Sequence, residues 1–124
     1  MNNKTILVID DDEEVLSLFE TFLTSIGYNS VTKASGESAK KWLKSNKPDL
    51  VLLDMMLPDI MGIDFAKWIN SNKKLKGIPV IHMTAFLSDD IAREDSMLSG
   101  AKDFITKPPD FNAVEKKIKS ILEG

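Results

Sequence analysis

The sequence predicts an α/β fold in which helices cover both faces of a five-stranded parallel sheet with strand order 2-1-3-4-5. Short apolar runs alternate with amphipathic segments along all 124 residues. The strongest runs lack an alternation of apolar and polar residues, which indicates strands buried on both faces and hence a parallel sheet. Right-handed crossovers leave few topologies for such a sheet, and the order 2-1-3-4-5 is the commonest for five strands.

The first two strand–helix units are expected before residue 45. Residues 6–9, ILVI, are rich in β-formers and too few for a buried helix. Apolar residues recur at helical spacing over residues 15–26, and Gly27 ends this helix. A weaker strand is expected at residues 28–33, followed by a short helix over residues 35–43.

Three further units follow from the same reasoning. Each contains a compact apolar run, a turn rich in Gly, Pro or Asp, and then a helical pattern. The expected elements are strands at residues 50–53, 79–83 and 103–106 and helices at residues 62–69, 89–99 and 111–122.

Composition excludes several classes of protein. The net charge is −3, and the 16 basic residues are not gathered into a stripe, so direct nucleic-acid binding is not expected. No apolar run approaches the roughly 18–20 residues that span a bilayer, and the amino terminus lacks the pattern of a secretory signal. The absence of cysteine excludes disulfides and thiolate metal sites. We therefore expect a cytoplasmic protein that does not bind membranes.

Polar residues follow the apolar runs where the strands are expected to end. Asp10 and Asp11 follow the first strand and Asp54 the third, while Thr84 and Lys107 follow the fourth and fifth. Ligands of such sheets bind outside the carboxyl ends of the strands, at the switch point between strands 1 and 3. Crowded carboxylates repel one another unless a cation lies between them, and oxygen ligands suit Mg²⁺ or Mn²⁺. The sequence therefore predicts a cation site at this edge.

The same residue types are suited to phosphoryl transfer. A carboxylate can act as the nucleophile and form an aspartyl phosphate. The reaction depends mainly on positioning and on neutralisation of charge, which a metal ion, a lysine and a hydroxyl supply. Lys107 would contact one phosphoryl oxygen as a point charge, and Thr84 would donate a hydrogen bond.

Four motifs in order, ILVIDDD, DLVLLDMMLPDIMG, PVIHMTA and GAKDFITKP, resemble those of bacterial response-regulator receiver domains of two-component and chemotaxis signalling. The resemblance extends from about Thr5 to the last helix. It implies a CheY-like, flavodoxin-like (βα)5 fold, and a single receiver domain over residues 1–124 with no effector domain.

The resemblance assigns roles to individual residues. Asp54 would be the phosphoacceptor. Asp10 and Asp11 would bind Mg²⁺ (Mn²⁺ is possible) together with Asp54 and the backbone carbonyl of Met56. Lys107 would contact the phosphoryl group.

It also implies a switch. Thr84 would contact the phosphoryl group and move towards it, and Phe104 would turn inward. These movements would change a partner surface formed by the fourth helix, the fifth strand and the fifth helix. The Lys107–Pro108 peptide bond is expected to be cis, as is usual in the family.

The resemblance implies a signalling module that receives phosphate from a sensor histidine kinase or a histidine phosphotransfer protein. Its downstream protein partner is not indicated, and a monomer, or a weak dimer when phosphorylated, is expected. The chain would not be an enzyme beyond self-catalysed phosphotransfer. Met56 and Phe86, at the two variable positions that flank the site, cannot orient a water by hydrogen bonding, so slow autodephosphorylation is expected.

Three alternatives use the same acidic cluster. Asp10 and Asp12 have the D-x-D spacing of haloacid-dehalogenase-like phosphatases, but the chain has no room for a cap domain and Asp54 would lack a role. A flavodoxin would need a phosphate-binding loop of Ser, Thr and Gly after the first strand, where this loop is acidic. An EF-hand would need Gly at its sixth position, which is Val15.

Several polar residues are better explained by structure than by function. Asp12 is expected to cap the first helix, where its charge favours the helix dipole. Asp59 and Asp64 flank a turn and a helix start, and His82, inside an apolar strand, is expected to pack rather than to bind a ligand.

Overall fold

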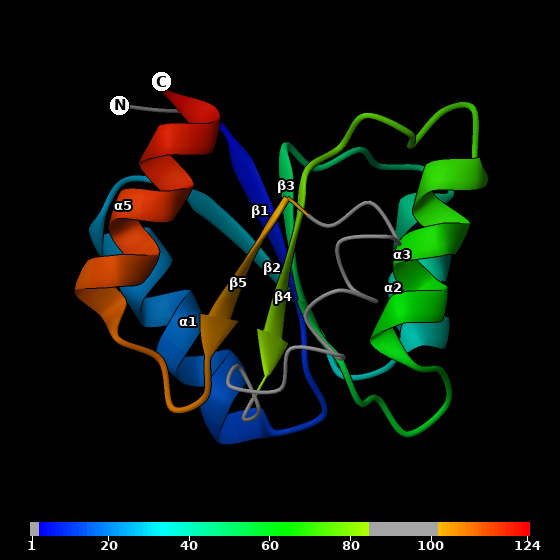
Figure 1. The fold of residues 1–124 in the computed structure, drawn as a ribbon, viewed down its shortest axis with the longest axis horizontal. Helices are drawn as coiled ribbons and strands as arrows, with labels where there is room; N and C mark the ends of the chain where they lie inside the picture. The colour runs from blue at the N-terminus through cyan, green and yellow to red at the C-terminus, as the bar shows by residue number, and fades with distance from the viewer. Residues whose placement is uncertain (1–2, 85–101) are drawn as a thin grey trace.

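A computed structural model describes residues 3–84 and 102–124, and Figure 1 shows its arrangement. The five strands form one parallel sheet in the order β2-β1-β3-β4-β5, which confirms the predicted topology. The strands are β1 (Thr5–Ile9), β2 (Asn29–Lys33), β3 (Leu50–Asp54), β4 (Val80–Thr84) and β5 (Asp103–Thr106). The described helices are α1 (Glu13–Ser25), α2 (Gly36–Leu43), α3 (Gly62–Ser71) and α5 (Phe111–Leu122).

The helices lie in two layers on opposite faces of the sheet. In Figure 1, α1 and α5 cover one face, while α2 and α3 cover the other. Two separate hydrophobic cores follow from this arrangement, because successive residues of a strand point to opposite faces. Leu7 belongs to the core under α2 and α3, and its neighbour Val8 belongs to the core under α1 and α5. Both side chains are fully buried, as expected for strands without polar alternation.

The helix ends agree with the signals in the sequence. Asp12 caps α1, since its carboxylate accepts hydrogen bonds from the backbone N–H groups of Glu14 and Val15. Gly27, just after α1, has φ of +96°, a conformation that glycine adopts without strain. The helix predicted at residues 89–99 lies outside the described residues.

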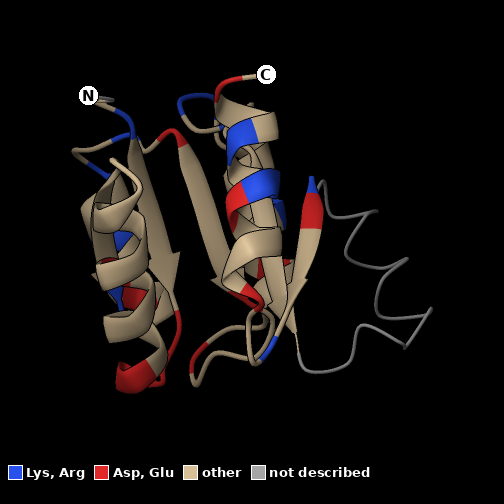
Figure 2. Cartoon of the chain, turned by 90° about the vertical axis from the view of Figure 1, so that its left-hand side faces the viewer, with Lys and Arg blue, Asp and Glu red and all other residues tan. Residues whose placement is uncertain are grey.

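Strand register brings the predicted polar residues to one edge of the sheet. Ile9 is paired with Leu53, so the next residues along the two strands, Asp10 and Asp54, lie next to each other. Asp54 is paired with Met83, and Thr84 with Thr106, the residue before Lys107. Figure 2 shows acidic residues at the end of the sheet towards which the strands point. None of the described helices is long and apolar enough to cross a bilayer.

Candidate functional site

Asp54 lies at the carboxyl end of the central strand β3, with only 7% of its surface exposed. Its Oδ1 accepts a hydrogen bond from the backbone N–H of Met56 at 3.2 Å. Its Oδ2 accepts one from Lys107 Nζ at 3.3 Å. The carboxylate is therefore anchored at both oxygens, by its own loop and by the loop after β5.

Asp10 lies at the end of the adjacent strand β1 and is fully buried. Its Oδ1 accepts a hydrogen bond from the N–H of Asp12 at 2.9 Å, and its Oδ2 lies 2.8 Å from Lys107 Nζ. This second contact is an ion pair with a buried carboxylate. Within the part of the chain that the structure describes, Asp10 Oδ2 is thus held by the charge of Lys107.

The structure brings Asp10, Asp11 and Asp54 together. One carboxylate oxygen from each residue lies within 4.8 Å of the others. Asp10 and Asp54 are buried, whereas Asp11 is exposed at the rim. Three carboxylates whose oxygens lie this close together suit a hard divalent cation such as Mg²⁺. The residues present therefore fit the cation predicted from the sequence.

Lys107 connects the two buried carboxylates, and its pKa is raised above the ordinary value. Burial alone would lower the pKa of this amine, but the carboxylates of Asp10 and Asp54 outweigh that effect. The side chain, about a quarter exposed at 23%, therefore remains a cation at the rim of the acidic cluster. A phosphoryl group at Asp54 would meet this positive charge.

The pKa of Asp54 is raised by burial, and the nearby charge of Asp10 acts in the same direction. The N–H of Met56 and the ammonium of Lys107 lower it but do not compensate fully. The ionised form of Asp54 is therefore held at a cost in free energy, which a bound cation would reduce.

The remaining predicted residues lie at the same edge. Thr84 is buried at the end of β4, and its carbonyl accepts a hydrogen bond from the Lys107 N–H at 3.0 Å. Met56 is exposed on the loop after β3. The Lys107–Pro108 bond is cis, the isomer expected from the resemblance. Phe86 lies outside the described residues.

Phe104 lies inside β5 and is buried, with 3% of its surface exposed. Its ring centroid is 6.4 Å from that of His82, its partner in the strand pairing. His82 is fully buried in β4, as the packing interpretation predicted. Its pKa is lowered by burial to about 4, so the imidazole is neutral at physiological pH.

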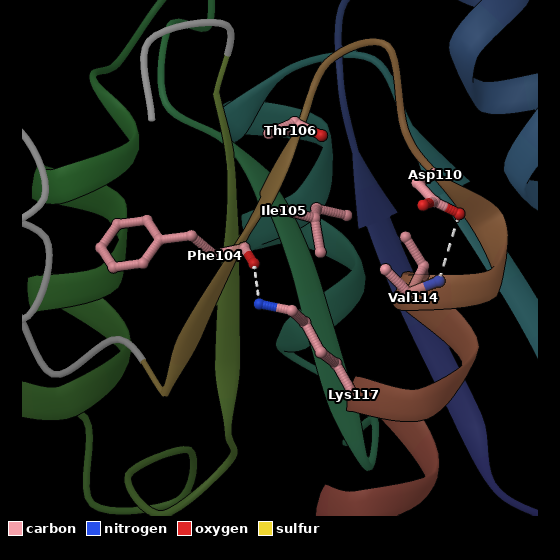
Figure 3. A pocket seen from close by; sticks show the side chains of 7 residues that line it. Phe104, Ile105, Thr106, Asp110, Val114 and Lys117 are labelled. Carbon is pink, nitrogen blue, oxygen red and sulfur yellow. Dashed lines mark hydrogen bonds between the residues drawn. The ribbon is translucent and has the colours of Figure 1, made fainter. Parts of the chain in front are cut away.

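A contact that the sequence did not predict fixes the backbone of Phe104. Lys117 on α5 donates from Nζ to the Phe104 carbonyl at 2.7 Å (Figure 3). It also donates to Asp103 Oδ1 at 2.9 Å. Asp103 Oδ1 also accepts a hydrogen bond from the N–H of Phe104 at 2.8 Å. Both backbone polar groups of Phe104 are therefore bonded by side chains. No local signal could have revealed this contact, because it depends on how α5 packs beside β5.

The contacts of Asp12 disfavour the alternative of a haloacid-dehalogenase-like phosphatase. Its Oδ1 accepts hydrogen bonds from the N–H groups of Glu14 at 2.9 Å and Val15 at 3.4 Å. The structure thus employs Asp12 as a helix cap, which removes the reason to assign it the second acidic role of a D-x-D phosphatase.

The fold and the site together define a class of α/β protein with an acidic cation site and a lysine at the carboxyl edge of a parallel sheet. Comparison with known families is consistent with this class: residues 6–119 match the response regulator receiver domain. The chain therefore belongs to the response regulator receiver domains of two-component systems.

Individual relatives agree with this assignment. The chain is 32% identical over 120 residues to the polar-differentiation response regulator DivK of Brucella ovis, covering 96% of each sequence. It is 36% identical to the alkaline phosphatase synthesis transcriptional regulatory protein PhoP of Bacillus subtilis, over 97% of this chain and 49% of that protein. The chain thus spans about half the length of PhoP.

A solved structure confirms the fold. A two-component response regulator from Clostridium difficile superimposes with a TM-score of 0.90 at 28% identity, covering 98% of this chain and 97% of that one. The sheet order and the two layers of helices are therefore those of a known receiver.

Proposed function

We propose that the chain accepts a phosphoryl group on Asp54 in a reaction that requires Mg²⁺, and that this modification changes its affinity for a protein partner. The observation that supports this proposal most directly is the meeting of three carboxylates and one lysine at a single edge of the sheet. The donor would be a sensor histidine kinase or a histidine phosphotransfer protein, and the site of action the cytoplasm.

Each residue has a defined part in the proposed reaction. An Asp54 oxygen attacks phosphorus while the bond from phosphorus to the donor atom breaks, and the donor leaves with that bonding pair. Asp10, Asp11, Asp54 and the Met56 carbonyl would hold Mg²⁺, which neutralises charge on the phosphoryl oxygens. Lys107, already a cation beside Asp54, contacts a further oxygen and stabilises the product.

The modification would act through Thr84 and Phe104. Thr84, at the end of β4, would donate a hydrogen bond from its hydroxyl group to a phosphoryl oxygen. The buried ring of Phe104 would be favoured in the phosphorylated state, so a partner that distinguishes the two positions of this ring would shift their populations. This mechanism would place the readout on the helix predicted at residues 89–99, on β5 and on α5.

The test is intact-mass measurement after incubation with acetyl phosphate and Mg²⁺. We expect the wild-type chain to gain one phosphoryl group, with release of acetate, and the gain to disappear when EDTA replaces Mg²⁺. Asp54→Ala should gain nothing, whereas Asp64→Ala, which removes an exposed carboxylate on α3, should gain the group as the wild type does. Equal labelling of wild type and Asp54→Ala would refute the proposal.

We further expect the phosphoryl group to be lost slowly. Met56 is exposed beside the site but its thioether cannot orient a water molecule as a hydroxyl, amide or carboxylate would. Met56→Gln should therefore shorten the half-life of the phosphorylated chain, because an amide can hydrogen-bond the attacking water. Decay can be followed by mass after the phosphodonor is removed. A wild-type half-life of only seconds would contradict this expectation.

A further inference from the structure

The loop between β3 and α3, residues 55–61, connects the phosphoacceptor strand to the rest of the fold and contains the carbonyl of Met56. The two ends of this loop are joined by backbone pairing. Gly62 donates its N–H to the Met55 carbonyl at 2.8 Å, and Met56 forms an antiparallel bridge with Met61. A Cβ atom on Gly62 would lie 2.6 Å from the carbonyl oxygen of Asp54, so only glycine permits this closure. The base of the loop is therefore fixed.

The tip of the loop is anchored to a different part of the chain. Asp59 accepts hydrogen bonds from the first two N–H groups of α2, at 2.9 Å from Gly36 to Oδ1 and at 2.8 Å from Glu37 to Oδ2. These N–H groups lower the pKa of Asp59, so it is ionised at neutral pH. A Cβ atom on Gly36 would lie 2.3 Å from Cγ2 of Ile60. The loop tip thus packs directly on the start of α2.

Helix α2 has a cap of its own. Ser35 Oγ accepts a hydrogen bond from the Ser38 N–H at 3.1 Å. The bonds from Asp59 are therefore additional to the local cap, and they are the ones that connect α2 to the loop. Met56 lies at the base of the loop, close in sequence to the anchored tip. With both parts held, the backbone at Met56 has little freedom to move.

We propose that Asp59 is a positioning residue that holds the Met56 carbonyl where the cation site needs it, by anchoring the β3–α3 loop to the start of α2. This inference rests on the proposed function, since it assumes that the Met56 carbonyl binds Mg²⁺. Asp59 itself does not contact the cation; it reduces the freedom of a ligand. Loss of this anchor leaves the three carboxylates in place but weakens the backbone ligand.

The test is Mg²⁺ binding to the unphosphorylated full chain, measured by isothermal titration calorimetry, with folding checked by circular dichroism. We expect Asp59→Ala to raise the Kd for Mg²⁺ by about tenfold, the lower end of the effect of losing a supporting group around a metal. Asp59→Asn keeps one side-chain oxygen that can accept an N–H, so its Kd should be intermediate. This milder variant also serves if Asp59→Ala folds poorly.

Two matched variants separate positioning from other effects. Ser35→Ala weakens the same end of α2 without touching the loop, and Asp64→Ala removes an equal charge from the first turn of α3. Both should bind Mg²⁺ within about twofold of the wild type, although Ser35→Ala should lower Tm by a few degrees. Unchanged affinity in Asp59→Ala, or an equal loss in Ser35→Ala, would overturn the inference alone. Failure of the wild type to bind Mg²⁺ would overturn the proposed function as well.

Discussion

Two buried ionisable residues on neighbouring strands, Asp54 and His82, have displaced pKa values with the same leading cause, which is burial. Burial disfavours the charged form, so it raises the pKa of the acid and lowers the pKa of the base. Asp54 lies where a cation and a lysine can compensate its charge. His82 is paired with Leu53 and Phe104, and a backbone hydrogen bond with Leu53 raises its pKa but does not offset the effect of burial. The two residues therefore contribute to stability with opposite dependence on pH.

His82 predicts a loss of stability in acid. Its pKa falls from 6.5 to about 4 in the folded chain, so between these values the unfolded chain binds more protons. Stability contributed by the neutral imidazole is therefore full above pH 6.5 and declines as the pH falls towards 4. A tenfold change in proton affinity corresponds to about 1.36 kcal/mol, so we expect the whole contribution to be about 3 kcal/mol.

The contribution of His82 to stability can be measured by urea unfolding of the wild type and of His82→Leu. The two pH values, about 7 and about 4.5, lie on either side of most of the histidine titration. The leucine variant has a constant packing difference at both pH values, so only the change in the difference between the two proteins reports the histidine. The wild type should lose more stability than His82→Leu as the pH falls. Parallel profiles would show that the imidazole is protonated as readily in the folded chain as in the unfolded one.

At this scale, the sequence was informative about the site because parallel strands end at a common edge. That rule predicted that Asp10, Asp11 and Asp54 would lie together, which the structure shows. The roles of Thr84 and of the Met56 carbonyl stay predictions. The partners of Asp59 could not be inferred, because they depend on the reach of a loop across space to a helix 23 residues earlier in the chain.

Among the described elements, β5 lies at an edge of the sheet and pairs only with β4. An edge strand exposes unpaired backbone groups that could pair with another chain. Here Asp103 and Lys117 bond the N–H and the carbonyl of Phe104, the residue with the proposed switch role. Side chains therefore bond the backbone of this edge strand at a buried residue, which fixes the backbone there.

Lys117 is expected to stabilise the fold through this edge. Lys117→Met keeps the aliphatic part of the side chain but removes the hydrogen bond to the Phe104 carbonyl, with an expected loss of about 1 kcal/mol. The ion pair with Asp103 adds little, because both side chains are about one-third exposed, at 34% and 37%.

Lys119→Met is the matched control, since Lys119 is on the same helix and, within residues 3–84 and 102–124, forms an ion pair only with the partly exposed Glu115 side chain. Thermal unfolding should give a lower Tm for Lys117→Met and an unchanged one for Lys119→Met. Equal Tm values in both variants would mean that the hydrogen bond from Lys117 to the Phe104 carbonyl does not stabilise the fold, because water replaces it equally well.

Periodicity located the described elements to within a few residues, because most of them bury one regular pattern of apolar residues. The strand predicted at residues 28–33 was the weakest, and the structure begins it at Asn29. That strand lies at the other edge of the sheet and is less buried than the central strands, so its pattern was less apolar. The third strand, predicted from the apolar run at residues 50–53 with Asp54 at its end, extends through Asp54 in the structure.

At the scale of the whole molecule, the acidic edge formed by Asp10, Asp11 and Asp54 lowers stability but provides the candidate cation site. Folding brings three carboxylates within 4.8 Å of one another, and the raised pKa of Asp54 shows that one charge is held unfavourably. The folded chain therefore binds more protons than the unfolded chain between the ordinary pKa of 3.8 and the raised value. Stability contributed by protonated Asp54 is lost as the pH rises through that window.

Asp54→Asn removes this cost without changing the shape of the side chain. The amide oxygen can still accept the N–H of Met56, and Lys107 keeps its ion pair with Asp10. In EDTA at neutral pH we expect the variant to be more stable than the wild type, because the amide lacks the buried charge that burial and Asp10 disfavour.

Mg²⁺ should reverse this order. A ligand that binds only the folded chain stabilises it by about 2.7 kcal/mol at roughly 100 times its Kd, and Asp54→Asn lacks one of the three carboxylates that attract the cation. Urea unfolding with EDTA and with saturating Mg²⁺ gives four free energies, whose double difference isolates the contribution of Asp54 to cation binding. Asp64→Asn, which removes an exposed carboxylate, should follow the wild type in both conditions. A variant less stable than the wild type in EDTA would mean that Lys107 already compensates the charge of Asp54, and that the acidic edge is not destabilising without a metal.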